Sequence, residues 1–312
     1  MKIKILDTFA VPVSLYDILK SLGTVSLFTD VVSDTDILLK RAQGGDVIVV
    51  NKTPVTAEVI QGLDSTVLIA ETASGYDNID TEAAAANTIA VCNVPGYSTP
   101  SVAEHVFAML FAASRKIRQC REQTNSGEWI DESLLGTELN GSSMGIVGFG
   151  AIGRSVCRTA LALGMQVSVH TGNPGKYREK YPDIPFVSLE QIIRESDIVT
   201  LHIPHTDETC RLISRDLLEA MKPGAVLVNT SRGGVVDEQA LTDVCRQGRI
   251  TACLDVLSSE PPAPENELLS LPGVLVTPHI AWYTLSAVER LIQETRDNIV
   301  SFFSGSPRNI VP

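Results

Sequence analysis

Short runs of hydrophobic residues alternate with amphipathic segments along almost the whole chain. A short, fully apolar run is typical of a buried strand in a parallel sheet, whereas an apolar residue at every third or fourth position is typical of a helix. Their alternation predicts repeated βα units and an α/β fold. The runs that we interpret as strands are Lys2–Leu6, Val25–Phe28, Asp46–Val50, Thr66–Ala70, Ile89–Cys92, Ser143–Val147, Val167–His170, Ile198–Ile203, Ala225–Asn229, Ala252–Val256 and Val274–Val276.

Helices are predicted between these runs and after the last of them. Ser101 and Glu104 have the spacing of a capping box, in which the first residue caps a helix and the fourth supports it. This pattern predicts a long helix that begins at Ser101 and continues through Ile117. The other helical patterns cover Val55–Gln61, Thr81–Asn87, Arg154–Leu163 and Ser286–Phe303.

The length and the order of these elements predict two domains. A chain of 312 residues exceeds what a single hydrophobic core usually serves. The first strands form one α/β series, and a second series begins at Ser143. Because the last helical pattern follows the second series, we expect it to cross back onto the first domain, with a cleft between the two domains.

Composition and charge exclude several classes of protein. Hydrophobic residues make up 44% of the chain and charged residues 20%, which favours globular cores over disorder. The net charge of −12 repels nucleic-acid phosphates and anionic lipids, so we expect neither a nucleic-acid partner nor a membrane surface. No apolar stretch approaches the roughly 18–20 residues of a membrane-spanning helix, and Asp7 interrupts any signal peptide. We therefore expect a soluble, cytoplasmic protein.

The cysteines and histidines do not predict a metal site. The six cysteines lack Cys-x-x-Cys spacing, and we interpret them as reduced residues of the cores. His202 and His205 lie close together, but no further cysteine or carboxylate clusters with them in the sequence. We expect no bound metal.

The most specific local motif is Gly148-Phe149-Gly150-Ala151-Ile152-Gly153, which follows a predicted strand and opens a predicted helix. In such a motif the first glycine permits a tight turn, the second lets the backbone approach a pyrophosphate, and the third allows close packing of helix and strand. The helix amides then face the anion. A purely structural turn is the alternative, but the strand, the spacing and the helix together favour dinucleotide binding at Gly148, Gly150, Ala151, Ile152 and Gly153.

The stretch after the next strand bears on the choice of cofactor. Enzymes that select NAD usually carry a carboxylate there for the ribose hydroxyls, and Val167–Arg178 contains none. Thr171 and Asn173 can hydrogen-bond a 2′-phosphate, and Lys176 or Arg178 can supply positive charge. We predict that NAD(H) or NADP(H) is the cofactor and that NADPH is used at least as well as NADH; a loop with relaxed cofactor choice is the alternative.

Three polar residues each follow a buried strand of the second series. Ligands of open α/β sheets bind outside the carboxyl ends of the strands, so Arg232, Glu260 and His279 are predicted to converge on one site. Taken singly, each has a plain alternative: a surface arginine, a capping glutamate, and a histidine satisfied within the core.

Together, these motifs and the stretches Ala73–Asp80, Asn93–Gly96 and Ser101–His105 resemble the D-2-hydroxyacid dehydrogenase family over most of the chain. The resemblance implies an α/β fold of two Rossmann-like domains with parallel sheets. A dinucleotide-binding domain, residues 100–283, would be inserted into a flavodoxin-like substrate domain, residues 1–99 and 284–312. It also implies an NAD(P)-dependent oxidoreductase that is usually a homodimer.

The same resemblance implies a role for each matching residue. His279 becomes the general acid and base, Glu260 its hydrogen-bonded partner, and Arg232 the clamp for the substrate carboxylate. A carboxylate beside an imidazole favours the protonated ring, and the planar guanidinium can hold a carboxylate through two hydrogen bonds. Backbone amides at Ser74 and Gly75 would complete the carboxylate site.

Other positions are assigned to the cofactor. Asp255 matches a position near the nicotinamide, where it can bond the carboxamide or support Arg232, and a cap at the end of the strand is the alternative. Pro204 and Thr206 match the adenosine side. Thr171 and Thr230 complete the expected cofactor-binding set.

The substrate is less well specified by the sequence. Pro278–Trp282 is similar to the corresponding segment of glycerate dehydrogenases and hydroxypyruvate reductases, and Thr171–Pro174 is similar to that of NADPH-using glyoxylate and hydroxypyruvate reductases. Asn173 departs from a basic residue often found there. We expect hydride transfer to a small 2-oxoacid, hydroxypyruvate or glyoxylate. The alternatives are a D-lactate-type or other 2-oxoacid reductase, a phosphite dehydrogenase, and a corepressor-like protein that binds dinucleotide without catalysis.

Overall fold

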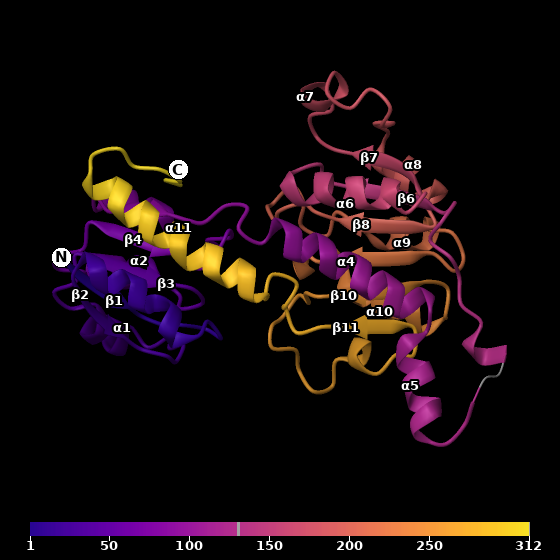
Figure 1. Cartoon of the computed structure of the whole chain (residues 1–312), viewed down its shortest axis with the longest axis horizontal. Helices are drawn as coiled ribbons and strands as arrows, with labels where there is room; N and C mark the ends of the chain where they lie inside the picture. The colour runs from indigo at the N-terminus through magenta and orange to yellow at the C-terminus, as the bar shows by residue number, and fades with distance from the viewer. Residues whose placement is uncertain (130–131, 312) are drawn as a thin grey trace. The chain divides into compact units, whose positions relative to one another are not determined.

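The computed structural model describes residues 1–129 and 132–311, and the chain divides into two compact units. Unit 1 consists of Met1–Ser98 and Tyr283–Pro312, and unit 2 of Thr99–Trp282. Each unit contains one parallel sheet with helices packed on it, so the α/β class predicted from the hydrophobic pattern is confirmed (Figure 1). Within the described residues, no helix is long and apolar enough to cross a membrane.

The sheet of unit 1 is five-stranded, with the order β2-β1-β3-β4-β5 and all pairs parallel. This is the flavodoxin-like strand order, in which the chain reverses its direction of winding between β1 and β3. The strands are β1 (Lys2–Ile5), β2 (Thr24–Leu27), β3 (Val47–Val50), β4 (Leu68–Glu71) and β5 (Ala90–Cys92). The helical segments between them are η1 (Val13–Leu22, 3₁₀), α1 (Thr35–Ala42), α2 (Ala57–Gln61) and α3 (Thr81–Ala86).

The C-terminal helix α11 (Leu285–Phe303) belongs to unit 1. It packs against β4 and η1, and Figure 1 draws it in yellow along the strands of unit 1. Asn298 Nδ2 donates to the carbonyl of Asn93 (2.8 Å), and Arg290 Nε donates to that of Tyr97 (2.8 Å). Both ends of the chain therefore build one unit.

The sheet of unit 2 is six-stranded and parallel, with the order β11-β10-β9-β8-β6-β7. The chain starts at β6, adds β7 on one side and then continues with β8 on the other. The carboxyl ends of β6 and β8 therefore mark the point where such sheets bind ligands. The strands are β6 (Ser143–Val147), β7 (Gln166–His170), β8 (Ile198–Leu201), β9 (Val226–Asn229), β10 (Thr251–Leu254) and β11 (Val274–Val276).

Helices cover both faces of this sheet because successive strand residues point in opposite directions. Ile146 packs with α4 and α6 in one core cluster, and the next residue, Val147, packs with α8, α9 and α10 in the other. The helical segments of unit 2 are α4 (Thr99–Ser114), α5 (Ile117–Asn125), η2 (Glu132–Leu134), α6 (Ala151–Ala162), α7 (Gly175–Arg178), α8 (Leu189–Glu195), α9 (Arg215–Ala220), η3 (Gly233–Val235), α10 (Glu238–Arg246) and η4 (Glu267–Leu269).

The long helix predicted from Ser101 through Ile117 is wrong at both ends. The helix begins at Thr99, so Ser101 lies inside its first turn and is not the cap. Pro100 explains the earlier start, because a proline in the first turn loses no helical hydrogen bond. The helix stops at Ser114, and Lys116 adopts a left-handed conformation (φ 49°) before α5 begins.

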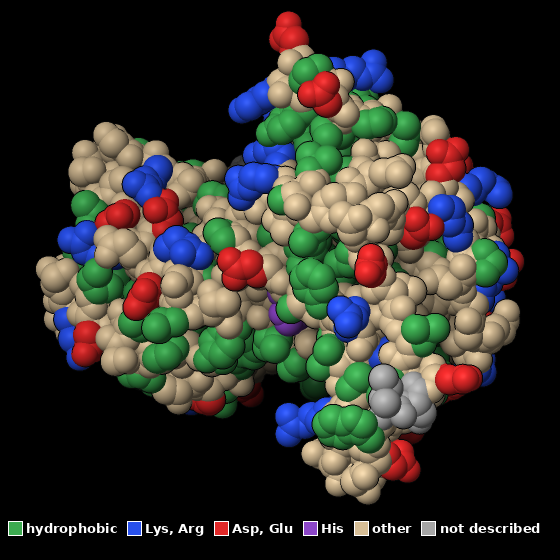
Figure 2. Space-filling model, turned by 45° about the vertical axis from the view of Figure 1, so that its right-hand side comes forward, with side chains coloured by type: hydrophobic (Ala, Val, Ile, Leu, Met, Phe, Trp, Pro, Cys, Tyr) green, Lys and Arg blue, Asp and Glu red, His purple; other side chains and the backbone are tan. Residues whose placement is uncertain are grey.

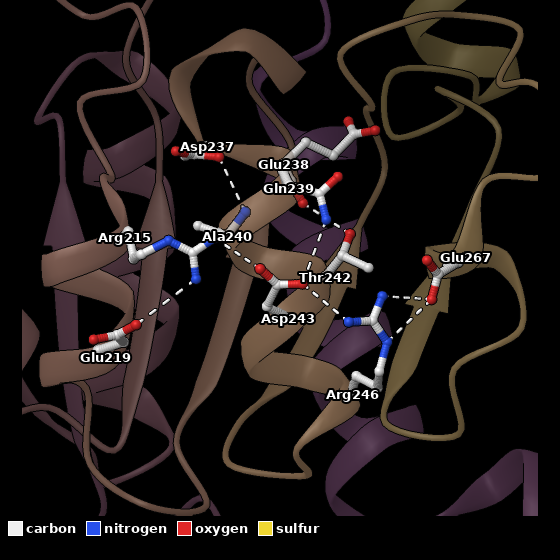
Figure 3. Close-up of polar contacts among 10 residues, drawn as sticks. All are labelled: Arg215, Glu219, Asp237, Glu238, Gln239, Ala240, Thr242, Asp243, Arg246 and Glu267. Atoms are coloured by element: carbon white, nitrogen blue, oxygen red, sulfur yellow. Dashed lines mark hydrogen bonds and ion pairs between the residues drawn. The ribbon is translucent and has the colours of Figure 1, made fainter.

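An ion-pair network joins α9, α10 and η4 on the surface of unit 2 (Figure 3). Asp243 accepts hydrogen bonds from Arg215 Nη2 (2.7 Å) and Arg246 Nη1 (2.9 Å), and Arg246 also pairs with Glu267 (2.5 Å). Single exposed pairs contribute little to stability, but here one carboxylate serves two arginines from different elements. The network ties α9, which precedes β9, to α10 and η4, which follow β9 and β10.

Candidate functional site

The glycine motif forms a tight turn at the end of β6. Gly148 has a left-handed φ of 97°, and a Cβ there would lie 2.3 Å from the carbonyl oxygen of His202. A Cβ on Gly153 would lie 2.1 Å from the carbonyl oxygen of Gly148, so α6 packs directly on the turn. Around Gly150, by contrast, no atom of the described residues outside Gly150 and its two chain neighbours lies within 4 Å of the Cβ position. The first and third glycines thus leave no room for a side chain, whereas the space next to the second glycine is empty.

This geometry fits the pyrophosphate of a dinucleotide. The ladder of α6 begins with the amide of Arg154, which donates to the carbonyl of Gly150 (3.1 Å). The amides of Ala151, Ile152 and Gly153 have no acceptor inside the helix by construction, and the positive end of the helix dipole lies there. Five of the predicted cofactor-binding residues therefore belong to one ready anion cradle.

The loop after β7 lies beside this cradle. Gly148 N donates to the carbonyl of His170 (2.8 Å), which places the next residue, Thr171, next to the glycine turn. Asn173 Oδ1 accepts the amide of Lys176 (3.3 Å), so this side-chain oxygen holds the start of α7.

Two basic side chains lie close to Tyr177 of α7. Lys176 Nζ lies 5.5 Å and Arg154 Cζ 5.8 Å from the ring centre of Tyr177, whose ring in turn meets Phe149 edge to face at 5.2 Å. Figure 2 shows Lys and Arg side chains at the top of the view, where α7 lies, together with hydrophobic and Asp or Glu side chains. The sequence analysis missed Arg154; its position directly after the last glycine of the motif was the available signal.

Two further cofactor candidates follow β8 and β9. Pro204 lies in an exposed segment. The hydroxyl of Thr209 donates a hydrogen bond to the carbonyl of Pro204 (2.7 Å) and accepts one from the amide of Thr206 (2.8 Å). Thr230 is buried, and among the described residues its Oγ1 has no hydrogen-bond partner. A buried hydroxyl without a partner costs free energy unless a ligand or water supplies one, so Thr230 fits a bound polar group.

His202 and His205 serve the local fold. Thr200 Oγ1 lies 3.0 Å from His202 Nε2, and burial lowers the pKa of His202 to about 3, so its ring is neutral at neutral pH. His205 Nε2 lies 2.7 Å from the Cβ position of Gly234. Among the described residues, no group of three or more His, Cys, Asp or Glu could hold a metal ion.

Arg232 is positioned by a turn at the end of β9. Asn229 Oδ1 accepts the amide (3.0 Å) and hydroxyl (2.8 Å) of Ser231, and Asn229 Nδ2 donates to the carbonyl of Arg232 (2.9 Å). A Cβ on Gly233 would lie 2.0 Å from the carbonyl carbon of Leu257, so the backbone after Arg232 lies flush against the segment leading to Glu260. Asn229 is a positioning residue that the sequence analysis did not single out.

Glu260 and His279 form a hydrogen-bonded pair. Glu260 Oε2 lies 2.6 Å from His279 Nδ1, and Glu260 Oε1 accepts the amide of Leu257 (3.1 Å). Glu238, at the start of α10, accepts the amide of Ser258 (2.6 Å) and so anchors the same loop. Because the carboxylate needs a proton donor, the pair places a proton on Nδ1 and leaves Nε2 available for proton exchange.

His279 itself has a left-handed backbone (φ 54°), which is uncommon for a residue with a side chain. Its amide donates to the carbonyl of Asp255 (2.8 Å), and the Asp255 carboxylate accepts the amides of Ile280 (2.9 Å) and Ala281 (2.8 Å). Trp282 Nε1 donates to the carbonyl of His279 (3.0 Å). Asp255 thus holds the turn that carries His279.

In unit 1, Ser74 and Gly75 lie in the loop after β4. Ser74 Oγ donates to the carbonyl of Val94 (2.9 Å), and Asn93 Nδ2 donates to that of Ser74 (2.7 Å). Asn78 Nδ2 donates to Glu71 (3.1 Å), whose burial raises the pKa of that carboxyl well above its ordinary value. These hydrogen bonds hold the loop to Val94 and Asn93 at Ser74 and to Glu71 at Asn78, and Ser74 remains exposed.

The structure brings three predicted residues to adjacent strand ends within unit 2. Arg232 follows β9, Glu260 follows β10 and His279 follows β11, and these strands are neighbours in the sheet. A fixed cation for a carboxylate and an imidazole paired with a carboxylate suit acid and base chemistry on a small anionic substrate.

Comparison with known proteins agrees with this site. The family model described as D-isomer specific 2-hydroxyacid dehydrogenase, NAD binding domain, matches residues 107–281. The chain is 36% identical to glycerate dehydrogenase of Methylorubrum extorquens, with 88% of each chain covered, and 39% identical to hydroxypyruvate reductase of Thermotoga maritima, with 83% and 85% covered.

A solved structure has the same fold over the full length. An acyclic imino acid reductase in complex with NADPH and D-Arg superposes with a TM-score of 0.91 at 34% identity, covering 100% of both chains. The family model and this full-length structural match span the glycine turn and all three strand ends described above. This chain therefore belongs to the D-isomer specific 2-hydroxyacid dehydrogenase family.

Proposed function

We propose that this protein is an NAD(P)-dependent reductase of small 2-oxoacids, with hydroxypyruvate or glyoxylate as its substrate and the D-2-hydroxyacid as its product. The observation that carries the proposal is the Glu260–His279 pair at 2.6 Å, on strand ends adjacent to Arg232 and in the same unit as the dinucleotide cradle. The names of the relatives, glycerate dehydrogenase and hydroxypyruvate reductase, support this choice of substrate.

In the proposed reaction, the glycine turn at Gly148–Gly153 would hold the dinucleotide, whose nicotinamide would supply the hydride for the carbonyl carbon of the 2-oxoacid. His279 donates the proton from Nε2 to the carbonyl oxygen as negative charge develops on it, and Glu260 stabilises the ring in its charged form. Arg232 holds the carboxylate through its planar fork and polarises the neighbouring carbonyl. We propose Ser74 and Gly75 as further substrate-binding residues.

We propose that the cofactor is NADPH, or both cofactors equally. Val167–Arg178 contains no carboxylate that would repel a 2′-phosphate. Arg154 precedes Thr171 in the chain and Lys176 follows it, and the side chains of both cations lie close to the ring of Tyr177. We also propose Pro204, Thr206, Thr230 and Asp255 as cofactor contacts, with the unpartnered hydroxyl of Thr230 as the strongest support.

A matrix of substrates against cofactors tests these proposals together. We expect hydroxypyruvate or glyoxylate to have the highest kcat/KM, and NADPH to serve at least as well as NADH. Lys176→Gln should raise the KM for NADPH about tenfold, because one charged hydrogen bond is worth ~1.5 kcal/mol, and leave the KM for NADH unchanged. Lys180→Gln, which changes a nearby exposed lysine, is the matched control.

Several outcomes of the matrix contradict the proposals. Turnover only of pyruvate or branched 2-oxoacids indicates a D-lactate-type enzyme, and turnover only of phosphite with NAD⁺ indicates a phosphite dehydrogenase. Turnover only of a 2-oxoacid mixed with an amine indicates an imino acid reductase, as the structural relative is named. Cofactor binding without any turnover indicates a corepressor-like role, and a strong preference for NADH contradicts the cofactor proposal.

We further propose a homodimer formed through α4 and the segment that follows it. A groove between α4 and α6 is lined by Phe107 and Phe111 together with Glu104 and Arg158. A two-fold axis through such a groove lets Glu104 of each copy face Arg158 of the other. The following segment, which extends from unit 2 around α5 in Figure 1, exposes further large apolar side chains: Ile117, Trp129 and Leu135.

Phe111→Glu is expected to convert the dimer to a monomer, because it places a charge in the centre of the proposed apolar contact. Light scattering after size exclusion should give twice 33.6 kDa for the wild type and a mass near 33.6 kDa for the variant. Phe303→Glu, an equally exposed phenylalanine on α11 of unit 1, is the control and should remain dimeric. A monomeric wild type contradicts the proposal.

The cysteines support a reducing compartment, and we propose the cytoplasm. All six are free thiols, and Cys92, Cys157, Cys245 and Cys253 are buried in the cores. Proteins of oxidising compartments more often pair their cysteines.

A further inference from the structure

A chain of hydrogen bonds runs from α4 to the turn that carries His279. His105, on α4, places Nε2 2.9 Å from Thr277 Oγ1. Thr277 Oγ1 lies 2.6 Å from Asp255 Oδ1, and His105 Nε2 itself lies 3.5 Å from the same oxygen. The three residues come from α4, from the end of β11 and from the end of β10, and all belong to unit 2.

The chemistry of the three groups fixes the direction of this chain. An ionised carboxylate only accepts hydrogen bonds, and a hydroxyl has a single proton to give. Thr277 therefore donates to Asp255, so its own oxygen accepts from His105. That arrangement requires a proton on Nε2 of His105, whether the ring is neutral or charged. The order of donation is His105 to Thr277 to Asp255.

Asp255 connects this hydrogen-bond chain to the turn that carries His279. Its side chain is almost fully buried, and it accepts the amides of Ile280 and Ala281 as well as the Thr277 hydroxyl. A residue with a side chain in the left-handed region is strained and persists only when its surroundings hold it. The bonds of the His279, Ile280 and Ala281 amides to Asp255 are part of those surroundings.

Helix α4 is fastened to the same strand ends at a second point. Thr277 Oγ1 also lies 3.9 Å from Met109 Sδ, one helical turn beyond His105, and Cys253 Sγ lies 3.8 Å from the Met109 carbonyl oxygen. The position of the His105 ring relative to Thr277 is therefore set by a packed helix and not by a mobile loop. A rigid support of this kind is what precise placement of a catalytic group needs.

We propose that His105 is a positioning residue for the reduction. By donating to Thr277 it orients Asp255, and through Asp255 it fixes the turn that presents His279 to Glu260. The expected effect on kcat rests on the proposed function. The expected effect on the stability of the His279 turn does not depend on any substrate. Misplacement of a catalytic group by about 1 Å can cost about a hundredfold in rate, so the chain His105–Thr277–Asp255 should be visible in kcat.

The first test measures the turn itself. His105→Leu removes the donor, and Thr277→Val removes the hydroxyl with little change in shape; His105→Gln keeps an N–H at a similar reach. Hydrogen exchange in the intact protein should be at least about tenfold faster at the amides of Ile280 and Ala281 in the first two variants. The glutamine variant should stay close to the wild type.

The second test measures catalysis on hydroxypyruvate with NADPH. His105→Leu and Thr277→Val should each lower kcat about 10- to 100-fold, with the KM for the oxoacid and the Kd for NADPH changed less than about twofold. The double variant should be no worse than either single variant, because both break one chain. His105→Gln should recover most of kcat, and Ser114→Ala, at the far end of α4, should not change it.

The outcomes separate the two proposals. Unchanged exchange at Ile280 and Ala281 in His105→Leu overturns the positioning role, as does an equal loss of kcat in the leucine and glutamine variants, which would reflect packing alone. A wild type that reduces no 2-oxoacid, combined with faster exchange in His105→Leu and Thr277→Val, would refute the proposed function and support the positioning role.

Discussion

His279→Gln is expected to lower kcat for 2-oxoacid reduction by about 10²- to 10⁴-fold, the usual contribution of a positioned general acid. Glutamine fills much of the space of the ring and can still donate to Glu260, but its amide is far too weak an acid to transfer a proton. The 2.6 Å bond between Glu260 and His279 Nδ1 predicts a loss for Glu260→Gln as well, because the change removes the charge that stabilises the protonated ring and its amide can donate to Nδ1 and hold the wrong tautomer.

Steady-state kinetics with saturating cofactor measure this effect, and fluorescence titration with NADPH supplies the control. The Kd for NADPH should stay within about twofold of the wild type, because the dinucleotide cradle is built from β6 and α6 and the hydrogen bonds of His279 go to Glu260 and to its own turn. If His279→Gln kept more than about a tenth of the wild-type kcat while its thermal unfolding was unchanged, His279 would not be the general acid.

The fold could be predicted largely from the sequence because parallel strands buried on both faces give unbroken apolar runs. Each predicted strand is present, and the differences lie at the ends. The run Ile198–Ile203 predicted a longer strand, but β8 ends at Leu201, since the carbonyl of His202 turns towards the glycine at position 148. The apolar pattern could not show this, because Ile203 is as hydrophobic as a strand residue. Likewise, the sequence around Lys116 does not predict the left-handed conformation of this residue, which lies just after the end of α4.

The candidate site could be predicted only in part. Polar residues after buried strands pointed to Arg232, Glu260 and His279, because the carboxyl ends of parallel strands share one edge. Their supports could not be found in this way. Glu238 and Ser258 are 20 residues apart, and His105 and Thr277 are 172 apart, so no local pattern links either pair. Hydrogen bonds across such separations follow from the packing of α4 and α10 on the sheet, which hydrophobic periodicity predicts without fixing its register.

Arg232→Ala is expected to lower kcat/KM for hydroxypyruvate by about 10²- to 10⁴-fold. Two charged hydrogen bonds to the substrate carboxylate, each worth about 1.5–3 kcal/mol, account for a loss of this size. Arg232→Lys should recover only part of it, because an ammonium keeps the charge but cannot reproduce the planar fork. The Asn229 bonds that shape the turn use the main chain of Arg232 and should survive both changes.

The carboxylate itself provides the sharpest control for this prediction. Hydroxyacetone carries a methyl group where hydroxypyruvate carries its carboxylate, so the wild type should prefer hydroxypyruvate by about the same 10²- to 10⁴-fold, and Arg232→Ala should remove most of that preference. If the variant lost activity equally on both ketones, Arg232 would serve the turn or the carbonyl and not the carboxylate. If it lost activity on neither, the anion of the substrate would be bound elsewhere. Because the net charge of −12 repels any anion at long range, the preference must come from donors fixed at the site. Arg232 is the one Lys or Arg that the three adjacent strand ends carry in their described turns at residues 230–232, 255–260 and 277–282.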